Sequence, residues 1–278
     1  MSTVKVGTEN STSIELYYED HGTGRPVVLI HGWPLSGRSW EAQVGPLVDA
    51  GLRVITYDRR GFGESSKPWT GYDYDTLAAD LNVLVEHLNL RDAALVGFSM
   101  GGGEVVRYLA KHNGAGRVTR AVLAGAVPPN LYKTPDNPEG ALDDKTLNNF
   151  QAAVRTDRIS FLDDFTRNFF SSNGQLKVSE RQRKFARLQG SLASPKGTLE
   201  CINAWGRTDF REDVKKLKVP LLVLHGDADA IVPFEVSGKR VAAMVPGAKT
   251  VLIKDGPHGF NASHPAEFNR ALLEFLKG

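Results

Sequence analysis

Short apolar runs recur along the chain at intervals that suit the strands of one sheet. Residues 26–31 (PVVLIH) and 93–98 (AALVGF) are almost free of polar side chains. Such runs are typical of strands that are buried on both faces of a parallel sheet. The predicted strands, including a more mixed aromatic and β-branched run near the start, are residues 13–20, 26–31, 52–58, 93–98, 118–126, 219–225 and 249–254.

Between these runs the apolar spacing changes to that of a helix. Leu77, Leu81 and Leu84, for example, recur at helical spacing and share one face. Helices are predicted on this basis over residues 74–88, 100–112 and 264–277. Strands that alternate with helices predict an α/β protein with a mostly parallel sheet and helices on both faces.

The alternation is interrupted between residues 128 and 213, where no strand is predicted. Several prolines mark the entry to this region, and helical patterns follow at residues 143–155, 158–170, 179–189 and 195–205. We therefore expect one catalytic core formed by residues 1–127 and 214–278. Residues 128–213 are expected to form a helical cap, inserted between two strands and covering one end of the sheet.

Composition excludes several classes of protein. Of the 278 residues, 34 are basic and 32 acidic, which leaves a formal charge of +2 and no electrostatic reason to expect nucleic acid or an anionic membrane as a partner. Cys201 is the single cysteine, so neither an internal disulfide nor a zinc cluster is expected. The polar start lacks the pattern of a signal peptide, and no apolar run is long enough to span a membrane. A cytoplasmic location is therefore expected.

The most specific chemical motif is Gly97-Phe98-Ser99-Met100-Gly101, between a predicted strand and a predicted helix. A G-x-S-x-G sequence in this position is typical of a nucleophile elbow, in which a tight turn presents the serine above a helix N-terminus. Larger side chains at the glycine positions would collide with the turn. Ser99 is therefore the predicted nucleophile.

A serine hydroxyl needs a base, usually a histidine that is oriented by a carboxylate. His258 follows the last predicted strand in a Gly/Pro-rich loop that can reach the elbow, and it is the predicted base. The acid is expected between the serine and the histidine in chain order. Asp227 and Asp229 both follow the strand at 219–225; Asp229 is favoured, and Asp227 stays an alternative that could instead brace the turn.

An oxyanion hole is expected from two backbone N–H groups. Met100 follows the nucleophile and supplies one, and Trp33, after the strand at 26–31, is the natural second donor. His31 is expected to be a structural histidine, and Arg59 and Arg60 are expected to form ion pairs in a turn.

Several longer stretches of sequence carry a resemblance to a known family. They are LYYEDHG at 16–22, HGWP at 31–34, YDRRGFG at 57–63, GYDYD at 71–75 and GFSMG at 97–101. With these motifs the sequence resembles α/β-hydrolase fold enzymes, in particular the bacterial group of cofactor-free haloperoxidases (perhydrolases), aryl esterases and a γ-lactamase. The resemblance implies Asp229 as the acid, His258 as the base and the amides of Trp33 and Met100 as the oxyanion donors. It implies neither a metal nor a haem, and relatives of this kind often form homo-oligomers.

The substrate pocket is expected under the cap. Phe161, Phe165, Trp205 and Phe260 are candidates for its lining, and packing within the cap is the alternative for the three cap residues. The predicted function is a serine hydrolase that cleaves small carboxylic esters. The alternative is a perhydrolase that makes peracids from hydrogen peroxide and a short carboxylic acid or ester, with γ-lactamase activity as a further option. A non-enzymatic ligand receptor on the same fold is a third alternative.

Overall fold

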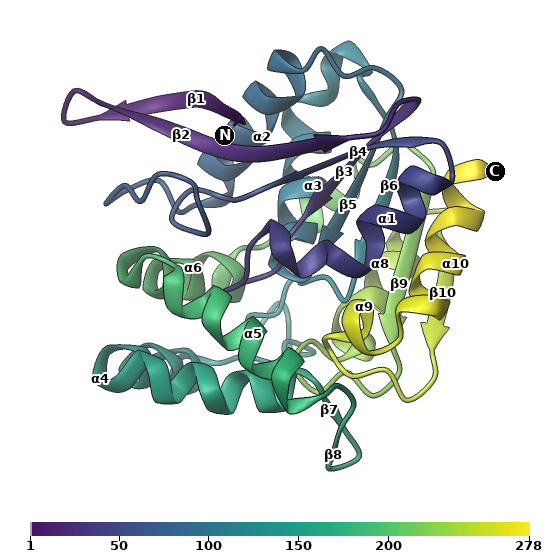
Figure 1. The fold of residues 1–278 in the computed structure, drawn as a ribbon. Coiled ribbons are helices and arrows are strands. Elements are labelled where there is room, and N and C mark those ends of the chain that lie inside the picture. The colour runs from purple at the N-terminus through teal and green to yellow at the C-terminus, as the bar shows by residue number, and fades with distance from the viewer. Residues whose placement is uncertain (1) are drawn as a thin grey trace.

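A computed structural model describes residues 2–278 and contains one large sheet surrounded by helices (Figure 1). Its eight strands run in the order β1-β2-β4-β3-β5-β6-β9-β10. Strand β2 pairs in antiparallel fashion with β1 and β4, and the other pairs are parallel. The strands are β1 (Ser2–Glu9), β2 (Thr12–His21), β3 (Arg25–Ile30), β4 (Leu52–Tyr57), β5 (Ala93–Phe98), β6 (Val118–Ala124), β9 (Leu221–Gly226) and β10 (Lys249–Ile253). The predicted α/β fold with a mostly parallel sheet is confirmed.

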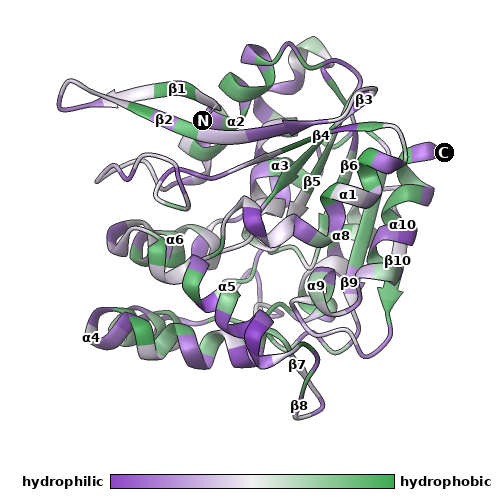
Figure 2. Cartoon of the chain, in the orientation of Figure 1, coloured by the Kyte–Doolittle hydropathy of each residue, from purple (hydrophilic) through white to green (hydrophobic). Residues whose placement is uncertain are grey.

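Helices cover both faces of this sheet. Helices α1 (Glu41–Asp49) and α10 (Pro265–Lys277) pack against each other, and α2 (Tyr74–His87) packs against α3 (Met100–Lys111). Helix α8 (Gly238–Met244) packs against β9. The strands between them are predominantly apolar in Figure 2, and β5 is buried along its whole length. This two-sided burial explains the uninterrupted apolar runs of the sequence.

A group of helices follows β6 and lies beside the carboxyl ends of the central strands (Figure 1). It consists of α4 (Asp144–Phe169), α5 (Glu180–Leu192), α6 (Pro195–Arg207) and the short α7 (Arg211–Val214). Helix α4 is kinked at Asp157, whose φ and ψ of −153° and 89° are not helical. The Asp157 carboxylate accepts the N–H of Ser160 at 2.9 Å and so caps the second half. The kink lies between the two helices predicted for this stretch.

Some elements differ from those predicted. A short hairpin formed by β7 (Ser171–Ser172) and β8 (Gln175–Leu176) lies in the region where no strand was expected. Its turn is Asn173-Gly174, both with positive φ, and such a turn needs no apolar pattern around it. Strand β1 and helix α1 were also not predicted; β1 is a largely exposed edge strand that carries little apolar signal. Within residues 2–278, no helix is long and apolar enough to cross a membrane.

Candidate active site

Ser99 occupies a sharp turn between β5 and α3. Its φ of 53° and ψ of −117° lie in a region that normally only glycine adopts. The neighbouring glycines are required by contact: a Cβ on Gly97 would lie 2.5 Å from the carbonyl oxygen of Gly101, and one on Gly101 would lie 2.5 Å from that of Ile30. The turn places the Ser99 hydroxyl beyond the carboxyl end of β5, as the elbow motif predicts.

The side chain of His258 lies against this hydroxyl. His258 belongs to the loop between β10 and the short helix α9 (Phe260–Ser263), and its Nε2 is 2.9 Å from Ser99 Oγ. Its ring is buried between Phe98 and Phe169, with ring centroids 5.2 Å and 4.9 Å away. These aromatic contacts hold the imidazole in the orientation that directs Nε2 at the serine.

The carboxylate of Asp229 completes the chain of contacts. Its Oδ2 lies 2.7 Å from His258 Nδ1, and its Oδ1 accepts the N–H groups of Ile231 and Val232 at 2.9 and 2.8 Å. Burial acts to raise the pKa of Asp229, but the charge of His258 and hydrogen bonds from His225 and His258 outweigh it and lower the pKa to about 2. Asp229 is therefore ionised near neutral pH and fixes the proton of His258 on Nδ1.

Asp227, the alternative acid, lies elsewhere. Its Oδ1 accepts the N–H of Asp255 at 2.6 Å, and its side chain is exposed to solvent. This contact joins the loop after β9 to the loop after β10, which corresponds to the bracing role considered for it. Of the two aspartates, the structure brings only Asp229 to His258.

The two expected oxyanion donors border the same space as Ser99. Trp33 and Met100 line one cavity with it, and neither backbone N–H donates to an acceptor within the described chain. Unpaired N–H groups at the edge of a cavity are available to a ligand oxygen.

This cavity has a volume of about 360 Å³, which is enough for a small organic molecule. It lies between the core and the helices that follow β6. Its lining residues are Trp33, Ser99, Met100, Val127, Leu131, Ala141, Leu142, Thr146, Phe150, Phe165, Trp205, Ala230, Ile231, Val232 and Pro233. None of these side chains is charged, so the cavity favours neutral, mainly apolar ligands.

The four aromatic pocket candidates have different positions. Phe165 and Trp205 line the cavity, where their rings lie 5.1 and 5.6 Å from that of Trp33. Phe161 stacks on Phe165 and is one ring removed from the cavity. Phe260 is fully buried against Phe98 and Phe268, so it packs in the core instead of bordering the cavity. Leu131, Phe150 and the 230–233 segment line the cavity without having been predicted, because no motif marks them.

The buried arginines form the ion pairs that were expected of them. Arg59 pairs with Glu104, and Arg60 pairs through two nitrogens with Asp80 at 2.6 Å each. Cys201 is fully buried nearby, and burial raises the pKa of its thiol to about 12. The thiol is therefore protonated near neutral pH and is not an alternative nucleophile.

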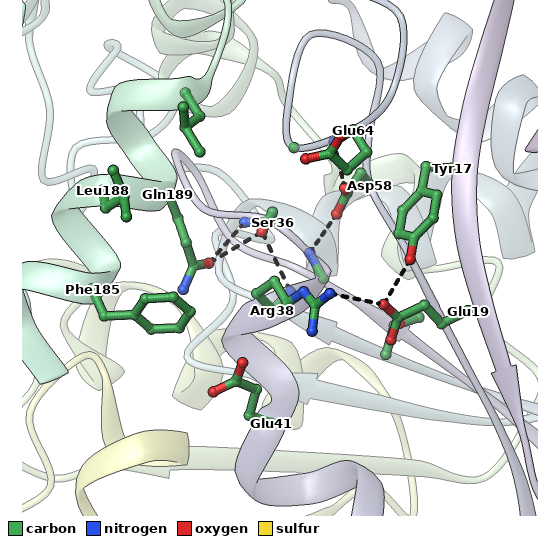
Figure 3. A pocket seen from close by; sticks show the side chains of 14 residues that line it. Tyr17, Glu19, Ser36, Arg38, Glu41, Asp58, Glu64, Phe185, Leu188 and Gln189 are labelled. Carbon is green, nitrogen blue, oxygen red and sulfur yellow. Dashed lines mark hydrogen bonds and ion pairs between the residues drawn. The ribbon is translucent and has the colours of Figure 1, made fainter. Parts of the chain in front are cut away.

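A second cavity of about 460 Å³ is lined in part by Ser36, Gly37 and Arg38, which follow Trp33 in the chain. Figure 3 shows Gln189 reaching from α5 towards Ser36, and Arg38 reaching towards Glu19. Ser36 Oγ donates to Gln189 Oε1 at 3.2 Å, which connects α5 to this loop. Ser99, Asp229 and His258 do not line this cavity, so it is separate from the site above.

The doubly covered parallel sheet and the serine on its elbow define the class of protein, an α/β hydrolase. The chain belongs to the family described as alpha/beta hydrolase fold, whose model matches residues 25–265.

Its similarity to individual proteins extends over nearly the whole chain. A non-heme chloroperoxidase of Kitasatospora aureofaciens is 44% identical over 95% of this chain and 96% of its own. A bifunctional esterase/perhydrolase of Acinetobacter calcoaceticus is 38% identical, again over 95% and 96%. The crystal structure of a bromoperoxidase from Bacillus anthracis has a TM-score of 0.97 and 57% identity, covering 100% of this chain and 99% of the other. These relatives agree with both the hydrolase and the perhydrolase activities expected from the sequence.

Proposed function

We propose that the protein hydrolyses small carboxylic esters through an acyl-enzyme on Ser99. Ser99 Oγ attacks the ester carbonyl while His258 Nε2 takes its proton, and the N–H groups of Trp33 and Met100 bind the resulting oxyanion. His258 then protonates the departing alcohol. Asp229 keeps the Nδ1 proton in place and stabilises the imidazolium that forms.

Deacylation repeats these steps with water. Water attacks the acyl carbon while His258 accepts its proton, the bond to Ser99 Oγ breaks, and the proton returns to Oγ as the acid leaves. The observation that carries this proposal is the continuous run of short contacts from Asp229 to His258 (2.7 Å) and from His258 to Ser99 (2.9 Å).

Perhydrolysis is a second activity of the same site, favoured by the names of the relatives and by the uncharged cavity. Hydrogen peroxide replaces water as the nucleophile: it attacks the acyl carbon, loses a proton to His258 and leaves as a peracid, while Ser99 Oγ regains a proton. Bromide or chloride is then oxidised by the peracid in solution. This route needs no halide site in the protein.

An ester panel with and without hydrogen peroxide tests the proposal. We expect turnover of p-nitrophenyl acetate, peracid formation when peroxide is added, and loss of both in Ser99→Ala. Peroxide should divert acyl groups from acid to peracid, since both products come from one intermediate. Activity that persists in Ser99→Ala would contradict the proposal, and binding of esters without turnover would favour the ligand-receptor alternative.

The acyl donor for perhydrolysis can be distinguished by pH. Because the lining of the cavity carries no charge, a free carboxylic acid should enter in its protonated form and an ester at any pH. The rate of peracid formation from acetate, divided by the rate from an ester at the same pH, should therefore fall by about tenfold for each pH unit above the pKa of the acid. The division removes the pH dependence of the base His258, which both donors share. Equal pH dependence for the two donors would contradict the importance of the uncharged lining.

A further inference from the structure

The two candidate oxyanion donors share one feature: each belongs to a peptide unit whose carbonyl is held by two hydrogen bonds. The carbonyl of Gly32, in one peptide unit with the Trp33 N–H, accepts Leu35 N at 3.0 Å and contacts His31 Nδ1 at 2.9 Å. The carbonyl of Ser99, in one unit with the Met100 N–H, accepts Gly102 N at 3.0 Å and Val127 N at 3.3 Å. In a trans peptide the oxygen and the N–H point in opposite directions. Hydrogen bonds that fix the direction of the oxygen therefore also fix the direction of the N–H.

Three of these four partners are backbone groups, and the fourth is the side chain of His31. Its ring is fully buried, and its Nε2 accepts the backbone N–H of Arg59 at 3.0 Å. Because an acceptor nitrogen carries no proton, the ring proton is on Nδ1 and is donated to Gly32 O. Burial, together with the nearby Arg59 charge, lowers the pKa of His31 well below its usual range, which agrees with a neutral ring.

Arg59 connects this arrangement to the helix that carries the other donor. Its guanidinium donates to the carbonyl of His31 at 2.6 Å and, through Nε, to Glu104 Oε1 at 2.6 Å. Glu104 lies in α3, one turn after Met100, and its other oxygen accepts the hydroxyl of Tyr57 at 2.7 Å. Arg59 therefore bridges the end of β3 and the first turns of α3, the two elements from which the oxyanion donors project.

We propose that Arg59 and His31 are positioning residues of the oxyanion hole. The Arg59 guanidinium sets the distance between residues 31–34 and helix α3. The backbone N–H of Arg59 selects the tautomer of His31 that donates to the Gly32 carbonyl, and this bond fixes the direction of the Trp33 N–H. This inference rests on the proposed function, because it assumes that these two N–H groups bind the oxyanion.

The chain contains a matched control for the ion pair. Arg60 and Asp80 form a neighbouring buried pair with two short hydrogen bonds. Within residues 2–278, the Arg60 side chain forms no hydrogen bond with residues 31–34 or with α3. Arg59→Lys and Arg60→Lys keep the charge and remove the planar, two-sided donor geometry of arginine. If Arg59 had a purely structural role, Arg59→Lys and Arg60→Lys should have the same effect on kcat.

Ester turnover is measured for both variants per active site, with the active fraction obtained by titrating Ser99 with a p-nitrophenyl phosphate triester. We expect Arg59→Lys to lower kcat by about 10- to 100-fold with KM within about threefold, less than the loss of a whole oxyanion donor. Arg60→Lys should keep kcat within about threefold of wild type, whatever it does to stability. Equal kcat values for the two variants would overturn the inference.

A double variant distinguishes the loss of positioning from the effect of leaving one charge buried without its partner. In Arg59→Met with Glu104→Met no unpaired buried charge remains, so the protein should fold even if a single variant does not. We expect its kcat to stay low, and its affinity for a boronic acid, which forms a tetrahedral adduct on Ser99, to fall by about tenfold or more. Wild-type kcat and boronate affinity in the double variant would overturn the inference.

The failure of the inference and that of the proposed function are distinguishable. If Ser99→Ala keeps its activity, the proposed function fails. If Ser99→Ala is inactive and Arg59→Lys behaves like Arg60→Lys, only the positioning role fails.

Discussion

Asp229 Oδ2 lies 2.7 Å from His258 Nδ1, and the other oxygen of the same carboxylate accepts two backbone N–H groups from its own loop. The backbone bonds orient the carboxylate, so that its remaining oxygen is directed at the imidazole. The nearby His225 Nε2 lies 3.4 Å from Oδ2 and 2.8 Å from the carbonyl of Val232, which further restricts this loop.

Replacement of Asp229 should be far more damaging than replacement of Asp227. Asp229→Asn removes the charge that stabilises the imidazolium and permits the wrong tautomer, so kcat for p-nitrophenyl acetate should fall by about 10⁴-fold. Asp227→Asn should leave kcat within a few-fold, because its side chain is exposed and contacts Asp255 instead of His258. The opposite order of the two effects would exchange the roles of the aspartates.

Activity should decrease on acidification, because a protonated His258 cannot accept the proton of Ser99. Asp229 does not cause this decrease, since its pKa is lowered to about 2. A carboxyl whose pKa is lower in the folded than in the unfolded protein stabilises the fold above the unfolded value, and this contribution is lost as the pH falls towards the folded value.

The same carboxylate therefore gives a stability prediction. The difference in unfolding free energy between wild type and Asp229→Asn should shrink between about pH 4 and about pH 2. Urea unfolding at a series of pH values measures it. A difference that is constant over this range would show that the ionised carboxylate does not stabilise the fold.

Phe165 should limit the size of the acyl group. Phe165→Val enlarges the uncharged cavity and should raise kcat/KM for hexanoate relative to acetate esters by about tenfold. Phe161→Val is the matched control, one helical turn earlier on α4 and outside the cavity lining, and it should leave the ratio unchanged. If both variants change the ratio equally, the acyl-length preference depends on how tightly the aromatic rings of α4 pack, and not on the position of Phe165 in the cavity lining.

Ser99 should be a strained residue. Its φ of 53° and ψ of −117° suit glycine and disfavour any residue with a Cβ. Ser99→Gly should therefore be more stable than Ser99→Ala by about 1 kcal/mol, although both variants lack the nucleophile. Thermal unfolding compares them, and an alanine variant at least as stable as the glycine variant would contradict this interpretation.

Much of the fold and of the candidate site could be predicted because local sequence specifies it. The buried strands have continuous apolar runs, and the elbow needs glycine at 97 and 101 for contact reasons that do not depend on the rest of the fold. The interruption of α4 at Asp157 was also visible as a break between two helical patterns.

Other features depend on contacts between distant segments. Phe260 is adjacent to the loop of His258, but its ring faces the core, and no local pattern indicates which side of the short α9 turns inward. Arg59 was expected to be in an ion pair, but its partner Glu104 lies 45 positions further along the chain. The link from this pair to the Trp33 loop becomes visible only in three dimensions.

The most direct test of the central claim is to trap the acyl-enzyme. The enzyme is mixed with p-nitrophenyl acetate, quenched in acid within the first turnovers, digested and analysed by mass spectrometry. We predict the mass increment of one acetyl group on the peptide that contains Ser99, its absence in Ser99→Ala, and faster loss of the label when hydrogen peroxide is added before the quench. Rapid turnover of the ester with the acetyl group on another residue, or with equal labelling of the Ser99→Ala variant, would contradict Ser99 as the nucleophile.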